Sequence, residues 1–237
     1  MYFEVSISAG AYINEYINGN TIFSIDDFID NYRETMFGTK EFQNFIVGLK
    51  KYNKNTKRKI DFYGIDLEFQ KDITKKVQEY LTLEHKTSIK NRIMDNQEKT
   101  TEINALDEKN FEIQREAVLL NNFVNVYKSN SLCYLGAWHI RQNSNDENFV
   151  KNLVKQHPRT QMLAVELLYK NSKRTVQDNK KYKIINVNDE FNEDDYHKYG
   201  DIFILKADNS QGVMVLENCI NTKMLKNYAK TFCQDFA

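Results

Sequence analysis

Ionisable side chains recur where short apolar runs of this 237-residue sequence end. His139 follows the run "LCYLGAW", while Glu4 and Asp66 lie in "YFEVSI" and "FYGIDLEF". Histidine has an ordinary pKa near neutral pH, so it can act as a general acid or a general base. Nearby carboxylates could orient the histidine or a water molecule. The pattern therefore indicates proton-transfer chemistry, with His139, Glu4 and Asp66 as the candidate catalytic residues.

Each of these residues also has a structural interpretation, which the sequence leaves open. A lone histidine at a strand–loop junction is often held by a structural hydrogen bond. Carboxylates such as Glu4 and Asp66 often cap the N-terminus of a neighbouring helix. Glu166 lies between apolar residues in "MLAVELLY", where a structural salt bridge is the favoured interpretation.

A predicted helix over residues 112–128 carries a second group of candidates. Arg115, Leu119, Asn122 and Val126 fall on one stripe of this helix. An arginine there could clamp a carboxylate of the substrate or of the protein, or it could pair at the surface with Glu112 or Glu116. The expected apolar face consists of Ile113, Ala117, Leu120, Val124 and Tyr127. With two further ionisable residues at strand ends, the candidate substrate-binding residues are Arg115, Asn122, Glu68 and Arg141.

The order of apolar patterns predicts an α/β fold, with a mostly parallel sheet flanked by helices. Predicted helices separate several of the predicted strands, and the pattern "DNSQG" favours an antiparallel final strand. Ligands of such sheets bind beyond the carboxyl ends of the strands. The expected strands are residues 2–7, 59–69, 132–137, 159–171, 201–207 and 212–218; the expected helices include 24–37, 39–56, 110–130, 146–156 and the C-terminal "NTKMLKNYAKTF".

Residues 70–110 are strongly charged and carry only a thin apolar stripe. This composition predicts exposed helices that form an insertion or cap within a single domain of residues 1–237. Such a surface could also dock a partner, which would make the chain an interaction protein. The acidic stretch "DEFNEDDYHKYGD" is expected to be a solvated loop.

Composition narrows the function classes. The 33 Lys and Arg residues balance 33 Asp and Glu residues, which argues against a nucleic-acid partner. No apolar run reaches membrane-spanning length, the N-terminus does not resemble a signal peptide, and three cysteines without close spacing favour a reducing cytoplasm. We therefore expect a cytoplasmic protein with a small-molecule substrate or ligand and no membrane association.

Common catalytic motifs are missing from the sequence. It contains no G-x-S-x-G, Walker A, G-x-G-x-x-G, H-E-x-x-H or C-x-x-C pattern. One histidine with scattered carboxylates is a poor transition-metal set, although an oxygen-rich Mg²⁺ or Ca²⁺ site stays open. We expect no cofactor.

Several motifs, taken in order, resemble those of the erythromycin-esterase-like family, within a wider group of ChaN-like and Tiki/TraB-like proteins. "IDFYGIDLEF" is similar to "v-f-y-G-f-D", and "QREAVLLNN" is similar to "R-D-x-x-M-A-x-N". "YLGAWHIRQ" corresponds to a strand written W-A-H-N-x-H-I, with Gly136 at the first histidine and His139 at the second. The resemblance implies a hydrolase of ester or related acyl bonds.

The resemblance also implies that this chain lacks one of the family's motifs. The family's G-E-x-x-H-G motif lies upstream of the strand that matches residues 2–7, so the chain is expected to lack it. Three consequences stay open: the remaining strands close up, a homo-oligomer or partner completes the sheet, or the chain is a truncated version of a longer protein. The alternative to an esterase-like hydrolase is therefore a catalytically degenerate binding or interaction protein of the same fold.

Overall fold

The computed structural model of the chain describes residues 1–128, 131–140 and 147–158, together with the backbone of six later strands. The first part alternates strands and helices, as predicted for an α/β fold. Its elements are β1 (Tyr2–Ser6), α1 (Ile7–Ile17), α2 (Ile25–Asn31), α3 (Lys40–Asn55), β2 (Tyr63–Asp66), α4 (Lys71–Leu83), α5 (Thr87–Asn104), α6 (Glu108–Val124), β3 (Cys133–Tyr134), α7 (Ala137–Ile140) and α8 (Phe149–Gln156).

The three strands of this part form one parallel sheet in the order β2-β1-β3. Tyr2 of β1 lies opposite Tyr63 on one side and Cys133 on the other. The described strands are therefore contiguous, with β1 in the centre. Because all three are parallel, their carboxyl ends meet at one edge of the sheet, as the sequence analysis expected.

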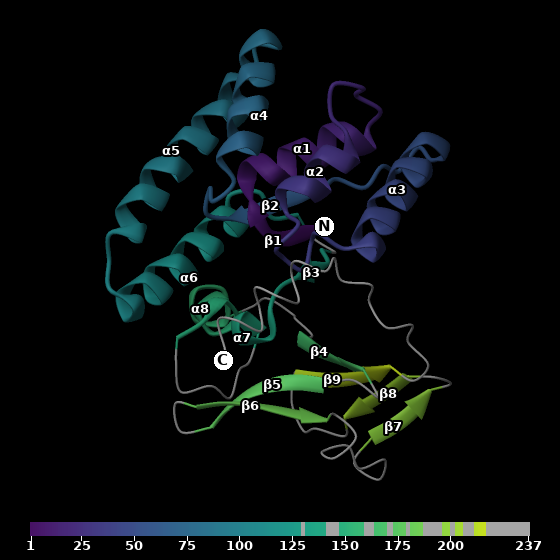
Figure 1. Cartoon of the computed structure of the whole chain (residues 1–237), viewed down its shortest axis with the longest axis vertical. Helices are drawn as coiled ribbons and strands as arrows, with labels where there is room; N and C mark the ends of the chain where they lie inside the picture. Colours follow the sequence, from purple (N-terminus) through teal and green to yellow (C-terminus); the bar gives the residue numbers. More distant parts are fainter. Residues whose placement is uncertain are drawn as a thin grey trace.

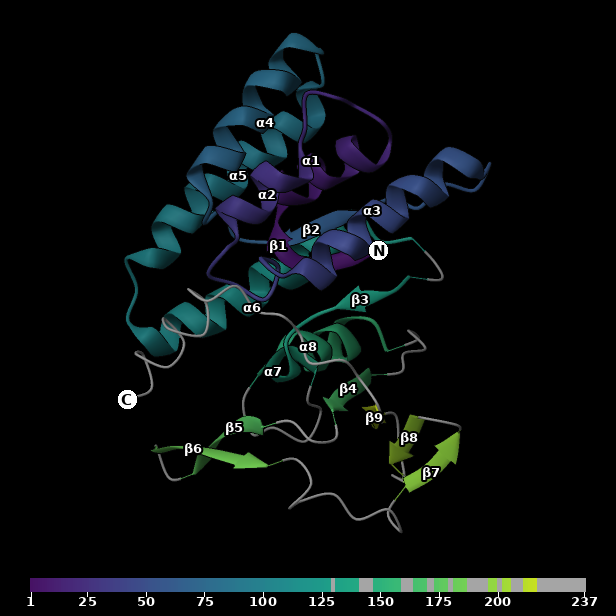
Figure 2. The ribbon, with the colours of Figure 1, turned by 45° about the vertical axis from the view of Figure 1, so that its right-hand side comes forward.

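Helices cover both faces of this sheet (Figures 1 and 2). Side chains alternate along a strand, so Phe3 and Val5 of β1 point to one face and Tyr2 to the other. Phe3 and Val5 join the core formed with α1, α2 and α3, and Phe3 stacks on Phe62 with ring centroids 4.3 Å apart. Tyr2 packs with residues of α6 and α8, among them Phe123 and Phe149. Glu4 comes two residues after Tyr2, which places it on the α6 face.

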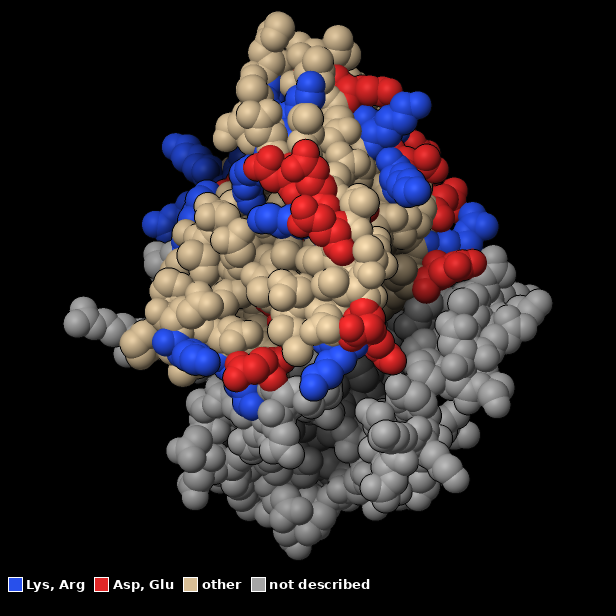
Figure 3. Space-filling view, turned by 90° about the vertical axis from the view of Figure 1, so that its left-hand side faces the viewer, with Lys and Arg blue, Asp and Glu red and all other residues tan. Residues whose placement is uncertain are grey.

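The charged stretch 70–110 forms helices, as predicted, but their apolar side chains are more deeply buried than the charged composition of the stretch suggests. Ile73, Val77, Tyr80 and Leu81 of α4 and Ile93 of α5 are buried in the same core as α1. Seen from the side of these helices, Lys and Arg residues alternate with Asp and Glu residues over the described surface (Figure 3). That this stretch is an insertion into a single domain stays a prediction.

Three of the later strands lie within or beside the predicted ranges, but their pairing differs from expectation. The later strands are β4 (Ala164–Tyr169), β5 (Lys173–Asp178), β6 (Lys181–Asn186), β7 (Tyr196–Tyr199), β8 (Ile202–Leu205) and β9 (Gln211–Leu216). The strand predicted over 159–171 does not extend the first sheet, because β4 pairs in parallel with β9 in a separate sheet of order β4-β9-β8-β7. The pairing of β8 with β9 is antiparallel, as predicted.

Two further corrections concern this second half of the chain. The acidic stretch predicted to be a loop contains β7, which pairs with β8 in an antiparallel backbone ladder. An antiparallel hairpin of β5 and β6, which was not predicted, lies between β4 and β7 in the chain. The predicted C-terminal helix lies outside the described residues. Among the helices that are described, none has the length and apolarity needed to cross a lipid bilayer.

Candidate functional site

The carboxyl edge of the parallel sheet brings together four of the seven predicted site residues. Glu4 comes from β1, Asp66 ends β2, and His139 lies in the short helix α7 directly after β3. Arg115 reaches them from α6, which covers that face of the sheet. Side chains between 49 and 135 residues apart in sequence thus become neighbours.

Arg115 joins the two carboxylates from β1 and β2. Its Nε and Nη2 donate to Asp66 Oδ1 and Oδ2 at 3.0 and 2.5 Å, and Nη2 also donates to Glu4 Oε1 at 2.8 Å. Asp66 is buried and also accepts from the backbone N–H of Leu67. The sequence left open whether this arginine holds a protein carboxylate, a substrate carboxylate or a surface glutamate; in this structure it holds Glu4 and Asp66.

His139 is held by a carboxylate at each ring nitrogen. Nδ1 is hydrogen-bonded to Glu116 Oε1, and Nε2 lies 2.9 Å from Glu4 Oε1. A carboxylate can only accept, so both nitrogens donate and the ring is an imidazolium. Burial alone would lower the pKa of His139, but the hydrogen bonds to Glu116 and Glu4 raise it to about 9.

Glu4 is the meeting point of three donors. Besides Arg115 and His139, the backbone N–H of Gly136 donates to Glu4 Oε2 at 2.7 Å. Burial alone would raise the pKa of Glu4, but these hydrogen bonds and the charges of His139 and Arg115 lower it to about 2. A Cβ at position 136 would lie 3.1 Å from Glu4 Oε2. Glycine at this position therefore permits the close approach of the backbone to Glu4.

These residues form a chain of alternating charges. Glu116, Glu4 and Asp66 are negative, while His139 and Arg115 are positive, so the formal sum is one negative charge. We call these five residues the charge chain. Its described groups pair with one another, and the second oxygen of Glu116, Oε2, is buried without a hydrogen-bond partner among the described residues.

Glu68 lies in a neighbouring polar cluster rather than in the charge chain. Its carboxylate accepts from the backbone N–H and hydroxyl of Ser8, from Thr74 and from Asn96. Ser8 lies in the first turn of α1, where a negative charge is favoured by the helix dipole. Burial raises the pKa of Glu68 despite the hydrogen bonds from Ser8 and Asn96. This predicted substrate-binding residue therefore caps a helix in the structure.

Asn122 also bonds to protein groups. Its Nδ2 donates to Ile65 O of β2 and to Asn96 Oδ1, both at 3.0 Å. Asn96 in turn donates to Asp66 O and to Glu68. The amide of Asn122 thus ties α6 to β2. Arg141, the last predicted substrate-binding residue, lies outside the described residues.

Sequence reasoning missed Glu116 as a site residue because it placed the apolar face of α6 incorrectly. The predicted face includes Ile113, which is 44% exposed, and Val124, which is 39% exposed. The buried face instead carries Glu116, Leu119, Leu120 and Phe123 at helical spacing, together with Val118 and Asn122. The spacing of Glu116 with the three apolar residues on one helix face was the sequence signal that could have indicated its burial.

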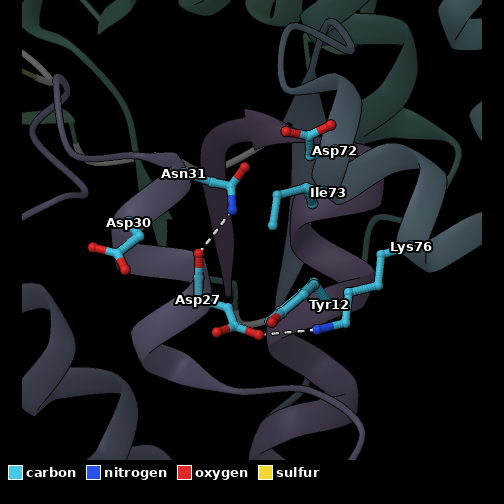
Figure 4. A pocket seen from close by; sticks show the side chains of 7 residues that line it. All are labelled: Tyr12, Asp27, Asp30, Asn31, Asp72, Ile73 and Lys76. Atoms are coloured by element: carbon cyan, nitrogen blue, oxygen red, sulfur yellow. Dashed lines mark hydrogen bonds and ion pairs between the residues drawn. The ribbon is translucent and has the colours of Figure 1, made fainter.

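An open cavity of about 310 Å³ lies elsewhere, between α2 and α4 with Tyr12 of α1 beside it (Figure 4). Asp27 and Lys76 line it and form an ion pair at 3.0 Å. None of the predicted site residues lines this cavity. Among the described residues, no three His, Cys, Asp or Glu side chains are placed to hold a metal ion.

The fold and the charge chain define an α/β domain with a histidine, an arginine and carboxylates at the carboxyl edge of a parallel sheet. The sequence model of the erythromycin esterase family matches residues 1–180, so the chain belongs to this family. The crystal structure of a succinoglycan biosynthesis protein is similar, with a TM-score of 0.61 and 13% sequence identity, covering 91% of this chain and 78% of that one. Comparison with curated proteins finds no significant match.

Proposed function

We propose that the chain is a hydrolase-type domain that cleaves an ester or related acyl bond of a small molecule. The observation that carries this proposal is the His139 imidazolium held between two carboxylates at the end of the parallel sheet. Membership of the erythromycin esterase family supports the same class of reaction. No cofactor is needed for it, and we place the activity in the cytoplasm on the sequence grounds given above.

The charge state of the site assigns the roles. At neutral pH His139 carries the proton, because its pKa is raised to about 9. It therefore acts as a proton donor rather than a base. In hydrolysis, a water oxygen attacks the acyl carbon, the bond to the leaving oxygen breaks, and Nε2 of His139 protonates that oxygen. Glu4, a weak base because its pKa is lowered to about 2, orients the water, and the neutral imidazole of His139 then accepts the proton that the water releases.

Arg115 and Asp66 serve this step indirectly. Arg115 donates to Glu4 Oε1, the same oxygen that contacts His139, and Asp66 fixes the guanidinium through two parallel hydrogen bonds. For the substrate to reach Nε2, the contact between His139 and Glu4 must open. The 16% exposure of the Glu4 side chain makes this the accessible end of the site.

A second candidate is a protein of the same fold that binds a small molecule without chemistry. It is favoured by one observation: His139, Glu4 and Arg115 all bond to other groups of the protein. The same contacts would make the charge chain a structural ion-pair network, in which buried charges compensate one another.

Turnover of a panel of chromogenic aryl and alkyl esters separates the two candidates. A hydrolase is expected to cleave at least one ester, and His139→Gln is expected to slow that cleavage by about 10²–10⁴-fold, the usual contribution of a positioned acid. His157→Gln, which changes an exposed histidine, is the matched control and should be silent. Full turnover by His139→Gln would sink the catalytic proposal. Ester binding without cleavage by the unmodified chain would favour the binding protein.

A further inference from the structure

We infer that Glu116 is the positioning residue of the site, which fixes the orientation and charge of His139 from the side opposite the substrate. This inference deepens the proposed function and rests on the role that it gives to His139. The motivating contact is the hydrogen bond between Glu116 Oε1 and His139 Nδ1. Glu116 contacts neither Glu4 nor Arg115 in any described hydrogen bond, so it acts through the histidine.

The two ends of the imidazole differ in their access to solvent. Glu116 is 1% exposed, whereas the Glu4 side chain at the other nitrogen is 16% exposed. Because the Glu4 contact is the more exposed of the two, we expect a reacting molecule to approach at Nε2. The Nδ1 end is sealed by α6, where a buried carboxylate can orient the ring without meeting the substrate.

The environment of Glu116 makes it a strong orienting group. It lies on the apolar stripe of α6 with Leu119, Leu120 and Phe123, so the helix and the core fix its position. Its Oε2 has no hydrogen-bond partner among the described residues, so His139 is the described group that compensates its buried charge. A buried carboxylate in that situation strongly favours a positive partner.

Two consecutive residues of α6 are therefore linked to Glu4, one directly and the other through His139. Arg115 bonds to Glu4 directly, and Glu116 holds His139 against it. Among the described residues, the charged groups that contact the imidazole are Glu4 from β1 and Glu116 from α6, with Arg115 of α6 and Asp66 of β2 beyond Glu4.

NMR titration of the His139 ring tests this inference without requiring a known substrate. The resonances are assigned by their loss in His139→Gln. In Glu116→Gln the side chain keeps its shape but loses its charge, so the titration midpoint of His139 should fall by about 1–3 pH units. The exposed Glu112→Gln, one turn earlier on the same helix, is the matched control and should leave the midpoint unchanged. An unchanged midpoint in a folded Glu116→Gln variant would overturn the inference.

A second measurement uses the unmodified protein and does not depend on how the variant folds. At pH 7 both ring nitrogens of His139 should carry a proton, and the Nδ1 proton should exchange with water more slowly than the Nε2 proton. Equal exchange, or an Nδ1 without a proton, would also overturn the inference. If instead both NMR results hold but no ester is cleaved, Glu116 positions His139 as inferred and the proposed hydrolase function is the part that fails.

Discussion

Gly10 of α1 lies directly against Gly64 of β2. A Cβ built on Gly10 would lie 1.9 Å from the backbone nitrogen of Gly64, and one built on Gly64 would lie 1.8 Å from Ser6 O. Real Cβ atoms do not approach backbone atoms so closely, so neither position accepts a side chain without moving α1 away from β2. This contact sets α1 where Ser8 reaches Glu68 and keeps the ends of β1 and β2 side by side.

Replacing either of these glycines with alanine should lower the free energy of unfolding. Moderate overpacking costs roughly 1–3 kcal/mol, and we expect a larger loss here because the added Cβ would clash with backbone atoms, which cannot move aside as a side chain can. The matched control is Gly48→Ala in α3, where a Cβ meets nothing within 4 Å. That change should stabilise the protein by about 0.5–1 kcal/mol, since alanine favours a helix interior over glycine. Urea unfolding of the three variants measures both effects, and equal stability of Gly64→Ala and Gly48→Ala would contradict the close contact.

Arg115→Gln should cost about 3 kcal/mol of unfolding free energy. The change leaves Asp66 and Glu4 without their cation, and removing one partner of a buried ion pair is strongly destabilising. This value is at the low end of the usual cost of breaking a buried ion pair, because the Arg115 side chain is still 18% exposed. Arg33→Gln breaks an exposed pair with Asp30 and should cost less than about 1 kcal/mol. Comparable losses in the two variants would show that the charge chain adds little stability.

Stability should depend on pH in two separate windows. The pKa of His139 is raised from 6.5 to about 9, so its contribution is complete below pH 6.5 and is lost as the pH rises through 9. The pKa of Glu4 is lowered from 4.5 to about 2, so its contribution is complete above pH 4.5 and is lost as the pH falls towards 2. Unfolding free energy measured in urea should therefore be highest between these windows.

The variant His139→Gln identifies the alkaline window. The stability difference between the unmodified protein and this variant should shrink between pH 6.5 and 9, because only the unmodified protein loses a charged imidazole there. A difference that stays constant across this range would mean that His139 is not the titrating group.

Asn122→Ala should act on stability rather than on ligand affinity. The change leaves Ile65 O and Asn96 Oδ1 without their donor, which costs about 1–3 kcal/mol when such groups are buried. The neighbouring Asn121 is exposed, and Asn121→Ala should stay within about 0.5 kcal/mol. If Asn122→Ala proves as stable as Asn121→Ala but weakens substrate binding, the original assignment of Asn122 to the substrate would be restored.

The sequence alone was sufficient for features that depend on local pattern. The parallel strands β1, β2 and β3 and the helix that carries Arg115 follow from side-chain type and spacing. The gathering of Glu4, Asp66 and His139 at one sheet edge also follows, because parallel strands end on the same side.

Only the tertiary structure decided which charged groups meet. Glu4 and His139 are 135 residues apart in the chain, and no local pattern states that they share a hydrogen bond. Glu116 looked like a solvent-facing residue because sequence patterns treat a carboxylate as exposed. It is buried because a partner, His139, arrives from another element to compensate its charge. Asn122 and Glu68 are hydrogen-bonded inside the protein for the same physical reason. A polar side chain is stable in the interior only where the fold places a hydrogen-bond partner next to it.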